Sequence, residues 1–326
     1  MRSTFLIVAL TTSFLAAPVN AGNVYELTDA SDVVGALSSY VSRYEDTLVD
    51  IGRMHNLGFE ELRLANPAVD PWLPGEGTEL TLPTAFILPQ AERRGLVVNI
   101  AEYRVYFYYR VDEQSFVAAL PVSIGRMDWA TPLGLTRIVA RAERPSWYPP
   151  ESVRQEYAED GRELPRVVPP GPDNPLGEYA LRLALPGYLI HGTNRPAGVG
   201  MQVTHGCIRL FPEDIKWLFP RTAVGMPVQI VNQPVKFGWV GDELYLEVHP
   251  PLEIAEGDSG LNMTVLTEEF VRATRDRAAA VDWELITNVF QARRGLPIRV
   301  GQAVIDEPVV DDGQKKAAAD AAAFSG

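Results

Sequence analysis

Apolar side chains recur at helical spacing in two short runs between residues 40 and 84. A glycine separates the runs, and Asn66-Pro67 ends the second one because proline cannot continue a helix. Residues 80–83 then have the composition of a short strand. The pattern predicts a small α+β unit with two amphipathic helices, whose inward positions are Leu48, Ile51, Phe59, Leu62 and Ala65.

From Gly95 to Val231 the apolar period shortens to two residues, which is typical of strands. Around residues 103–110, one set of aromatic and apolar side chains alternates with a more polar set, which predicts a half-buried strand. The segment 144–175 carries eight prolines and is expected to be a loop that lines a binding site. We therefore expect an all-β sandwich or partly open barrel. The other predicted strands are 116–124, 136–140, 179–183, 188–191 and 228–231.

After this region, residues 234–248 predict a hairpin that turns at Gly241-Asp242. Two helices should follow, one with Thr267 as its N-cap and one over residues 282–293. The tail is expected to be disordered because its composition is poor in large apolar residues. The chain as a whole is thus predicted to be mainly β, with a C-terminal extension that contains a hairpin and helices.

Composition narrows the class of protein. Of the 326 residues, 46% are hydrophobic, which supports a folded protein, and the net charge of -13 argues against nucleic-acid binding. The first 21 residues have the basic start, short apolar core and small-residue end of a signal peptide. That core is too short to span a bilayer, and no later stretch is long enough. We therefore expect an exported protein without an integral membrane segment.

Cys207 is the only cysteine, so no intramolecular disulfide can form in the oxidising compartment that export implies. The thiol is then either a small buried hydrophobe or a nucleophile. His191 ends an apolar strand sixteen residues upstream and can accept the thiol proton. Gly206 has no Cβ, so the amides of residues 206 and 207 can point toward an oxyanion, and His205 can help to shape that site. Together these residues predict an acyl-transfer dyad.

These residues resemble the active-site signature of the L,D-transpeptidase catalytic domain, also called the YkuD domain. Two flanking segments, Ala130 to Gly134 and Asn174 to Gly177, resemble the Thr-Pro-x-Gly and Asn-Pro-Leu-Gly segments of that family. One position departs from the family, which most often has serine where this chain has Thr204. Threonine keeps the hydroxyl, so a hydrogen bond within the loop can survive, although its methyl group stiffens the side chain. The signature comprises Ile190, His191, Gly192, Thr193, Asn194, Gly200, Thr204, His205, Gly206, Cys207, Ile208, Arg209 and Leu210.

The region of the two predicted helices resembles a LysM module, which implies binding to glycan strands that contain N-acetylglucosamine. A generic helical hairpin is the alternative. Together with the signal peptide, this resemblance implies a periplasmic enzyme of a Gram-negative bacterium. The expected division is a signal peptide at 1–21, a LysM-like peptidoglycan-binding module at 38–84, a catalytic domain at 95–231, a C-terminal extension at 232–305 and a disordered tail at 306–326.

The family resemblance also implies a reaction. Cys207 would attack the carbonyl of the third stem-peptide residue, usually meso-diaminopimelate, and expel the terminal D-alanine. An amine would then take the acyl group from the thioester. That amine belongs either to a second stem, giving a 3→3 cross-link, or to the C-terminal lysine of an outer-membrane lipoprotein. Water as acceptor would make the protein an L,D-carboxypeptidase or thiol hydrolase.

The remaining candidate residues have two interpretations each. Arg209 either recognises a carboxylate of the stem peptide or forms a structural ion pair that fixes the cysteine loop. Thr193 and Trp147 are candidates for substrate contacts, and Trp147 has aromatic packing under the long loop as its alternative. The four histidines show no metal-binding spacing, so neither a metal nor an organic cofactor is expected. The alternative from another functional class is a LysM-type cell-wall binding protein whose β domain has no catalytic activity.

Overall fold

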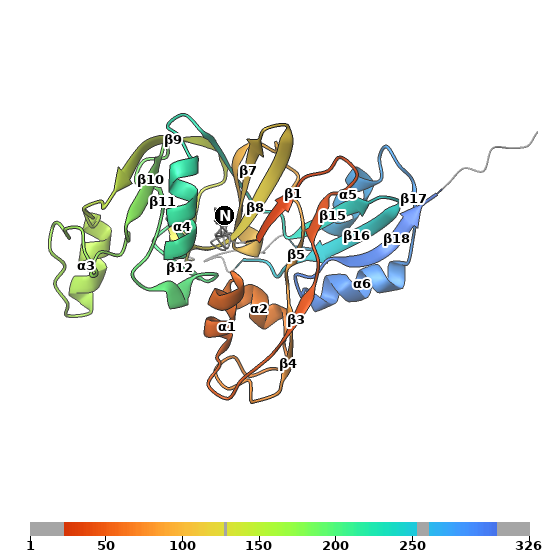
Figure 1. The fold of residues 1–326 in the computed structure, drawn as a ribbon, viewed down its shortest axis with the longest axis horizontal. Helices are drawn as coiled ribbons and strands as arrows, with labels where there is room; N and C mark the ends of the chain where they lie inside the picture. Colours follow the sequence, from red (N-terminus) through yellow and green to blue (C-terminus); the bar gives the residue numbers. More distant parts are fainter. Residues whose placement is uncertain (1–22, 127–128, 253–260, 305–326) are drawn as a thin grey trace, which may run out of the picture.

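We describe a computed structural model in which residues 23–126, 129–252 and 261–304 are defined. The predicted signal peptide and the predicted disordered tail lie outside the described residues. Within the described part, no helix combines the length and apolarity that crossing a bilayer requires. Three units follow one another along the chain: an N-terminal unit, a central unit built on a large sheet, and a C-terminal unit. Figure 1 shows the first and last of them packed against the central one.

The central unit is a closed β-barrel. Its strands follow in the order β8, β13, β11, β10, β9, β14, β6 and β7, and the pairing of β7 with β8 closes the ring. Of the two architectures expected from the sequence, the barrel is confirmed, although its ring is closed rather than partly open, and the sandwich is wrong. Apolar side chains from all eight strands fill its interior. The strands are β6 (Gly95–Asn99), β7 (Arg104–Val111), β8 (Gln114–Gly125), β9 (Gly134–Glu143), β10 (Tyr179–Leu183), β11 (Leu189–His191), β13 (Ile208–Leu210) and β14 (Pro227–Val231).

The long strand β8 also pairs with two shorter strands outside the ring. These are β1 (Asn23–Glu26) and β12 (Gln202–Thr204). Two helices accompany the barrel, α3 (Glu151–Glu159) and α4 (Pro212–Leu218), so residues 95–231 are not all-β as the sequence suggested. The helix α3 lies inside the proline-rich segment that was expected to be a loop.

Strand β7 is buried on both faces, which corrects the half-buried strand expected from its alternating pattern. Val105 and Phe107 pack in the barrel interior. Tyr106 and Tyr108 point the other way and pack against the N-terminal unit. An aromatic side chain suits either surface, so alternation alone could not show that the outer face is covered.

The N-terminal unit contains the two predicted helices, α1 (Leu48–His55) and α2 (Phe59–Ala65). Thr47 caps α1 with a reciprocal bond to Asp50, a capping box that fixes where the helix begins. Both predicted helices and the closing strand are confirmed. The strands of this unit are β2 (Val33–Gly35), β3 (Ser38–Val41), β4 (Glu79–Leu82) and β5 (Ala85–Ile87), paired as β2 with β5 and β3 with β4.

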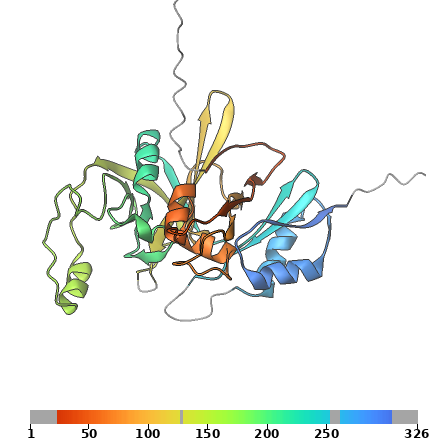
Figure 2. The ribbon, with the colours of Figure 1, turned by 60° about the horizontal axis from the view of Figure 1, so that its bottom comes forward.

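This unit is docked tightly on the barrel, below it in Figure 1 and in front of it in Figure 2. The free N–H groups of Phe59 and Glu60, at the start of α2, donate to the carbonyls of Val199 and Gly200. A Cβ at Gly200 would lie 2.3 Å from the Cα of Gly58, so only glycine allows this approach. The segment that leads into the cysteine loop thus lies against α2.

The C-terminal unit is a four-stranded antiparallel sheet with two helices. The predicted hairpin is confirmed, and α6 begins after its N-cap Asp282, as expected. The predicted N-cap Thr267 is wrong, because Asn262 caps α5 and Thr267 lies inside the helix. The elements are β15 (Val235–Val240), β16 (Glu243–Val248), α5 (Met263–Ala273), β17 (Ala279–Val281), α6 (Trp283–Ala292) and β18 (Ile298–Ala303).

Candidate active site

The strand pairing places three signature side chains on one side of the sheet. Strands β11 and β13 run parallel, with His191 opposite Arg209. Ile208 and Leu210 point into the barrel core. Because successive side chains alternate along a strand, Cys207 and Arg209 point the other way, toward the side that His191 occupies.

That side opens into a cavity of about 910 Å³. Its wall contains the nucleophile, base and substrate candidates from the sequence, while Gly206 lies behind the surface in the cysteine loop. Prolines and aromatic residues of segment 144–175 line the same cavity. The signature residues that line the cavity are His191, Thr193, His205, Cys207 and Arg209, and Trp147 lines it from the long segment.

His191 is held as a neutral imidazole. It is 3% exposed, and burial, together with the nearby charge of Arg209, lowers its pKa to about 3. Its Nδ1 lies 2.6 Å from the carbonyl oxygen of Gly192. Since a carbonyl can only accept, Nδ1 carries the proton, and Nε2 is the unprotonated nitrogen of the neutral ring. His191 can therefore accept a proton at Nε2.

Cys207 rests as a thiol. Burial raises its pKa above the ordinary value, whereas the Leu189 N–H and the charge of Arg209 act in the opposite direction. Its Sγ lies 3.7 Å from the carbonyl oxygen of Gly187, which is consistent with a weak S–H donor. The thiolate must therefore form when a base takes the proton.

The cysteine loop is fixed by two threonine hydroxyls. Thr204 Oγ1 donates to the Cys207 carbonyl at 2.6 Å. Threonine at this position therefore keeps the hydrogen bond within the loop that serine could form. Thr131, from the Thr-Pro-x-Gly segment, donates to the Gly206 carbonyl at 3.0 Å. Gly206 has a φ of +95°, and a Cβ there would lie 2.7 Å from the ring of Tyr188. Glycine is therefore required at this position.

The amides of Gly206 and Cys207 are available as oxyanion donors. Neither N–H donates to an acceptor among residues 23–126, 129–252 and 261–304. Two free N–H groups beside the thiol are the arrangement that a developing oxyanion needs.

Comparisons with known proteins agree with this geometry. The family model of the L,D-transpeptidase catalytic domain (YkuD) matches residues 93–230. Probable L,D-transpeptidase YcfS of Escherichia coli strain K12 is 39% identical over 293 residues, which cover 88% of this chain and 90% of that protein. The chain belongs to the L,D-transpeptidase family.

Other relatives cover less of the chain. Probable L,D-transpeptidase ErfK/SrfK of Salmonella typhimurium is 40% identical over 247 residues, or 74% of this chain and 79% of that protein. A crystal structure of an L,D-transpeptidase from Mycobacterium tuberculosis H37Rv covers 48% of this chain and 63% of its own at 19% identity. The TM-score of that pair is 0.30, too low for a comparison of details.

The site of this L,D-transpeptidase includes residues that the sequence did not reveal. Glu156, on α3, accepts from His205 Nε2 at 2.9 Å and from Arg126 Nη2 at 2.7 Å. The hydrogen bonds from Arg126 and His205 lower the pKa of Glu156 to about 2, so it stays ionised. No sequence motif links Glu156 to His205, because 49 residues separate them. Only the folded segment brings α3 to the cysteine loop.

The Asn-Pro-Leu-Gly segment closes the base of the long segment. Asn174 is fully buried, and its amide donates to the carbonyls of Pro145, Val168 and Pro169. Its carbonyl oxygen accepts from the Leu176 N–H at 2.9 Å. One side chain therefore holds both ends of the wall that faces Cys207.

Arg209 does not show the structural ion pair that was its alternative interpretation. No carboxylate in the described part of the chain lies within ion-pairing distance of it. Its Nε is buried and has no hydrogen-bond partner among the same residues. The guanidinium thus lines the cavity without a carboxylate partner among the described residues.

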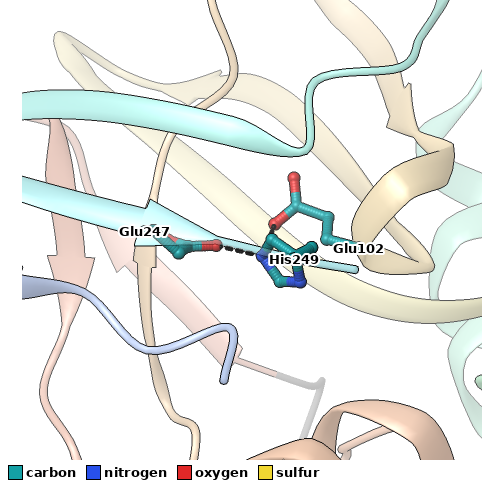
Figure 3. A group of neighbouring side chains, drawn as sticks. All are labelled: Glu102, Glu247 and His249. Carbon is teal, nitrogen blue, oxygen red and sulfur yellow. Dashed lines mark hydrogen bonds and ion pairs between the residues drawn. The ribbon is translucent and has the colours of Figure 1, made fainter. Parts of the chain in front are cut away.

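A separate group of ligand-type side chains lies between the barrel and the C-terminal unit. The ligand atoms of Glu102, Glu247 and His249 lie within 4.8 Å of one another (Figure 3). The Lys236 ammonium lies 2.7 Å from Glu102 and 2.8 Å from Glu247, and it donates to the Ile87 carbonyl at 2.6 Å. All three ammonium protons therefore have acceptors, and the lysine already supplies the positive charge that a metal would bring. The cluster is better suited to joining the units than to binding a metal.

Proposed function

We propose that this protein is a periplasmic L,D-transpeptidase that acts on peptidoglycan stem peptides, with Cys207 as nucleophile and His191 as general base and acid. The observation that supports it most directly is the shared cavity wall, where the thiol and a buried neutral imidazole lie on the same side of the sheet. Relatives that carry the L,D-transpeptidase name in Escherichia coli and Salmonella support the same assignment.

In the first half-reaction, Cys207 Sγ forms a bond to the carbonyl carbon of the third stem residue while its proton passes to His191 Nε2. The amides of Gly206 and Cys207 donate to the oxyanion. Collapse of the tetrahedral intermediate breaks the C–N bond, and His191 returns the proton to the leaving amine of D-alanine. A thioester on Cys207 remains.

In the second half-reaction, an acceptor amine attacks the thioester and His191 takes its proton. Collapse releases the Cys207 thiolate, which recovers the proton from His191, so no net proton is consumed. The amine of a second stem gives a 3→3 cross-link, and the lysine of a lipoprotein gives a tether to the outer membrane. Neither half-reaction needs a metal or an organic cofactor.

The N-terminal unit extends the proposal to glycan strands. Its two short helices between paired strands are consistent with the LysM-like module expected at 38–84. Docking of α2 beside residues 199–200 would hold a bound glycan strand at a fixed position relative to the cavity. The signal peptide expected at 1–21 would deliver the enzyme to the periplasm.

The test is incubation of the mature protein with a disaccharide-tetrapeptide, with and without a peptide that ends in lysine, followed by mass spectrometry. Dimers that lack D-alanine mean cross-linking, and a lysine adduct means tethering. Tripeptide alone means hydrolysis, the alternative that uses the same residues. Cys207→Ala should abolish all three products.

A second measurement distinguishes the proposed enzyme from a cell-wall binding protein whose β domain is catalytically inactive. A carbapenem, which acylates the cysteine of this family, should add its mass to the folded protein but not to Cys207→Ala. Folded protein that binds peptidoglycan yet forms neither adduct nor product would contradict the proposed activity and favour a binding protein.

A further inference from the structure

Two arginines lie on the cavity wall, and neither has a carboxylate partner among the described residues. Arg195 and Arg209 both line the cavity. Neither forms an ion pair with a carboxylate in the described ranges 23–126, 129–252 and 261–304. In a chain with a net charge of -13, carboxylates are plentiful, so this pairing of like charges is unusual.

The local structure brings the side chain of Arg209 to the turn that begins at Arg195. Arg195 begins a tight turn, with its N–H donating to Thr193 Oγ1 at 2.9 Å. Gly198 follows in the same turn, and a Cβ there would lie 3.7 Å from Nη1 of Arg209. The guanidinium of Arg209 therefore reaches the turn that carries Arg195.

The electrostatics of Arg209 agree with this placement. Burial lowers its pKa, and the positive charge of Arg195 acts in the same direction. Asp173 is the one carboxylate among the described residues that line the cavity, and it is exposed. Arg195 is exposed and Arg209 is half-buried, so an anion that binds beside both would offset their mutual repulsion.

We propose that Arg195 and Arg209 form a carboxylate site beside Cys207, which holds the terminal carboxylate of the residue that the reaction releases. This proposal rests on the proposed function, because that function supplies the donor. Arg209 lies two residues beyond Cys207 on the same side of the strand, at about 6–7 Å along the backbone. In a tetrapeptide donor, three bonds join the scissile carbonyl carbon to the terminal carboxylate carbon. The side-chain carboxylate of diaminopimelate is six bonds away, so the terminal group fits a cation this close to the nucleophile better.

The site would set where the donor is cut. A guanidinium pair grips one carboxylate with several charge-assisted hydrogen bonds. A donor with a further residue, or with a neutral end, would leave both arginines unpaired. The enzyme should therefore release a single terminal residue that carries a free carboxylate.

The experiment compares three disaccharide-tetrapeptide donors, one with both carboxylates free, one with a terminal carboxamide and one with an amidated diaminopimelate side chain. Mass spectrometry follows total donor consumption, so hydrolysis and transfer count equally. The wild type should consume the free acid about 10- to 100-fold faster, by kcat/KM, than the terminal carboxamide. Arg195→Gln should lower kcat/KM for the free acid by about tenfold, mainly through KM, and leave the terminal carboxamide unchanged. Arg209→Lys should keep part of the preference, because it keeps the charge but not the planar fork.

A matched control and an independent readout separate the outcomes. Arg182→Gln removes another cation from the same cavity wall, and it should keep the wild-type preference for the acid. Alkylation of Cys207 by iodoacetamide, a neutral reagent, should be equally fast in Arg195→Gln, which shows an intact nucleophile. Equal consumption of acid and terminal carboxamide by the wild type overturns the site, as does a preference that is undiminished in Arg195→Gln or one that follows side-chain amidation. If wild-type protein is alkylated at Cys207 but consumes none of the donors, the proposed function is overturned, and the carboxylate site with it.

Discussion

At the scale of single residues, Cys207 and His191 are held in a neutral resting state. Burial acts on both, raising the pKa of the thiol and lowering that of the imidazole to about 3. The proton therefore stays on sulfur until substrate arrives. This differs from a preformed thiolate–imidazolium pair, in which a charged imidazole lowers the pKa of the thiol.

The neutral pair predicts the pH dependence of thiol reactivity. Below its pKa, the thiolate fraction of Cys207 rises about tenfold per pH unit, so iodoacetamide alkylation should rise with the same slope from about pH 6 to beyond the ordinary thiol pKa of about 8.5. N-acetylcysteine amide, as the control, should level off near the ordinary thiol pKa, whereas Cys207 should continue to rise. Mass spectrometry of the alkylated protein measures the rate. A rate that stays constant across this range would show a preformed thiolate and contradict the neutral resting state.

At the scale of elements, α3 is tied to the cysteine loop through a single carboxylate. Glu156 accepts from His205, two residues before Cys207, and from Arg126, which follows the end of β8. Elsewhere, α3 buries only Val153 against the protein. The position of α3 beside the cysteine loop therefore depends on Glu156.

We expect Glu156→Ala to lower kcat/KM for the tetrapeptide donor by about tenfold, because His205 and Arg126 lose a charged hydrogen-bond acceptor. Limited proteolysis within 144–175 should become faster at the same time. Glu151→Ala is the matched control on the same helix, since its pair with Arg154 is exposed and should contribute little. If the two variants behave alike, Glu156 does not position the loop.

Some of these elements could be predicted from the sequence and others could not. The barrel strands and α1 and α2 follow from apolar periodicity, because each buries a regular set of side chains. The helix α3 was missed since one buried residue, Val153, makes no periodic face. The second buried face of β7 was missed for another reason: its cover comes from helices that precede it in the chain. The sequence motif predicted that Cys207 and His191 belong to one site. Glu156 belongs to no motif, and only the folded structure shows that it contacts the cysteine loop.

At the scale of the whole molecule, buried polar groups join the units. Glu61 of α2 forms an ion pair with Arg104 of β7, and both side chains are almost fully buried. The Lys236 cluster joins the barrel to the C-terminal hairpin in the same way. Since breaking a buried pair costs about 3–5 kcal/mol, the units are expected to unfold together rather than separately.

Asp214, at the start of α4, adds a pH-sensitive contact to the docking of the N-terminal unit. Its Oδ1 accepts from Asn56 Nδ2 at 2.7 Å, while Oδ2 is buried without a partner among the described residues. Burial raises the pKa of Asp214 to about 7. In the unfolded chain the carboxyl group should have its ordinary pKa of about 4. Between these values the folded state holds one more proton, so this group's contribution to stability is full at low pH and is lost as pH rises toward 7.

Asp214→Asn should therefore remove a pH-dependent part of the free energy of unfolding. Relative to the wild type, the variant should gain stability by at most about 1.4 kcal/mol per pH unit between about pH 4 and 7, with no further gain above 7. Urea denaturation across this range measures the difference. Glu213→Gln is the neighbouring control, because its exposed pair with Arg53 crosses the same junction and should change stability by less than about 1 kcal/mol. Parallel pH profiles for the wild type and Asp214→Asn would mean that the Asp214 carboxylate is already ionised in the docked state, with water reaching Oδ2.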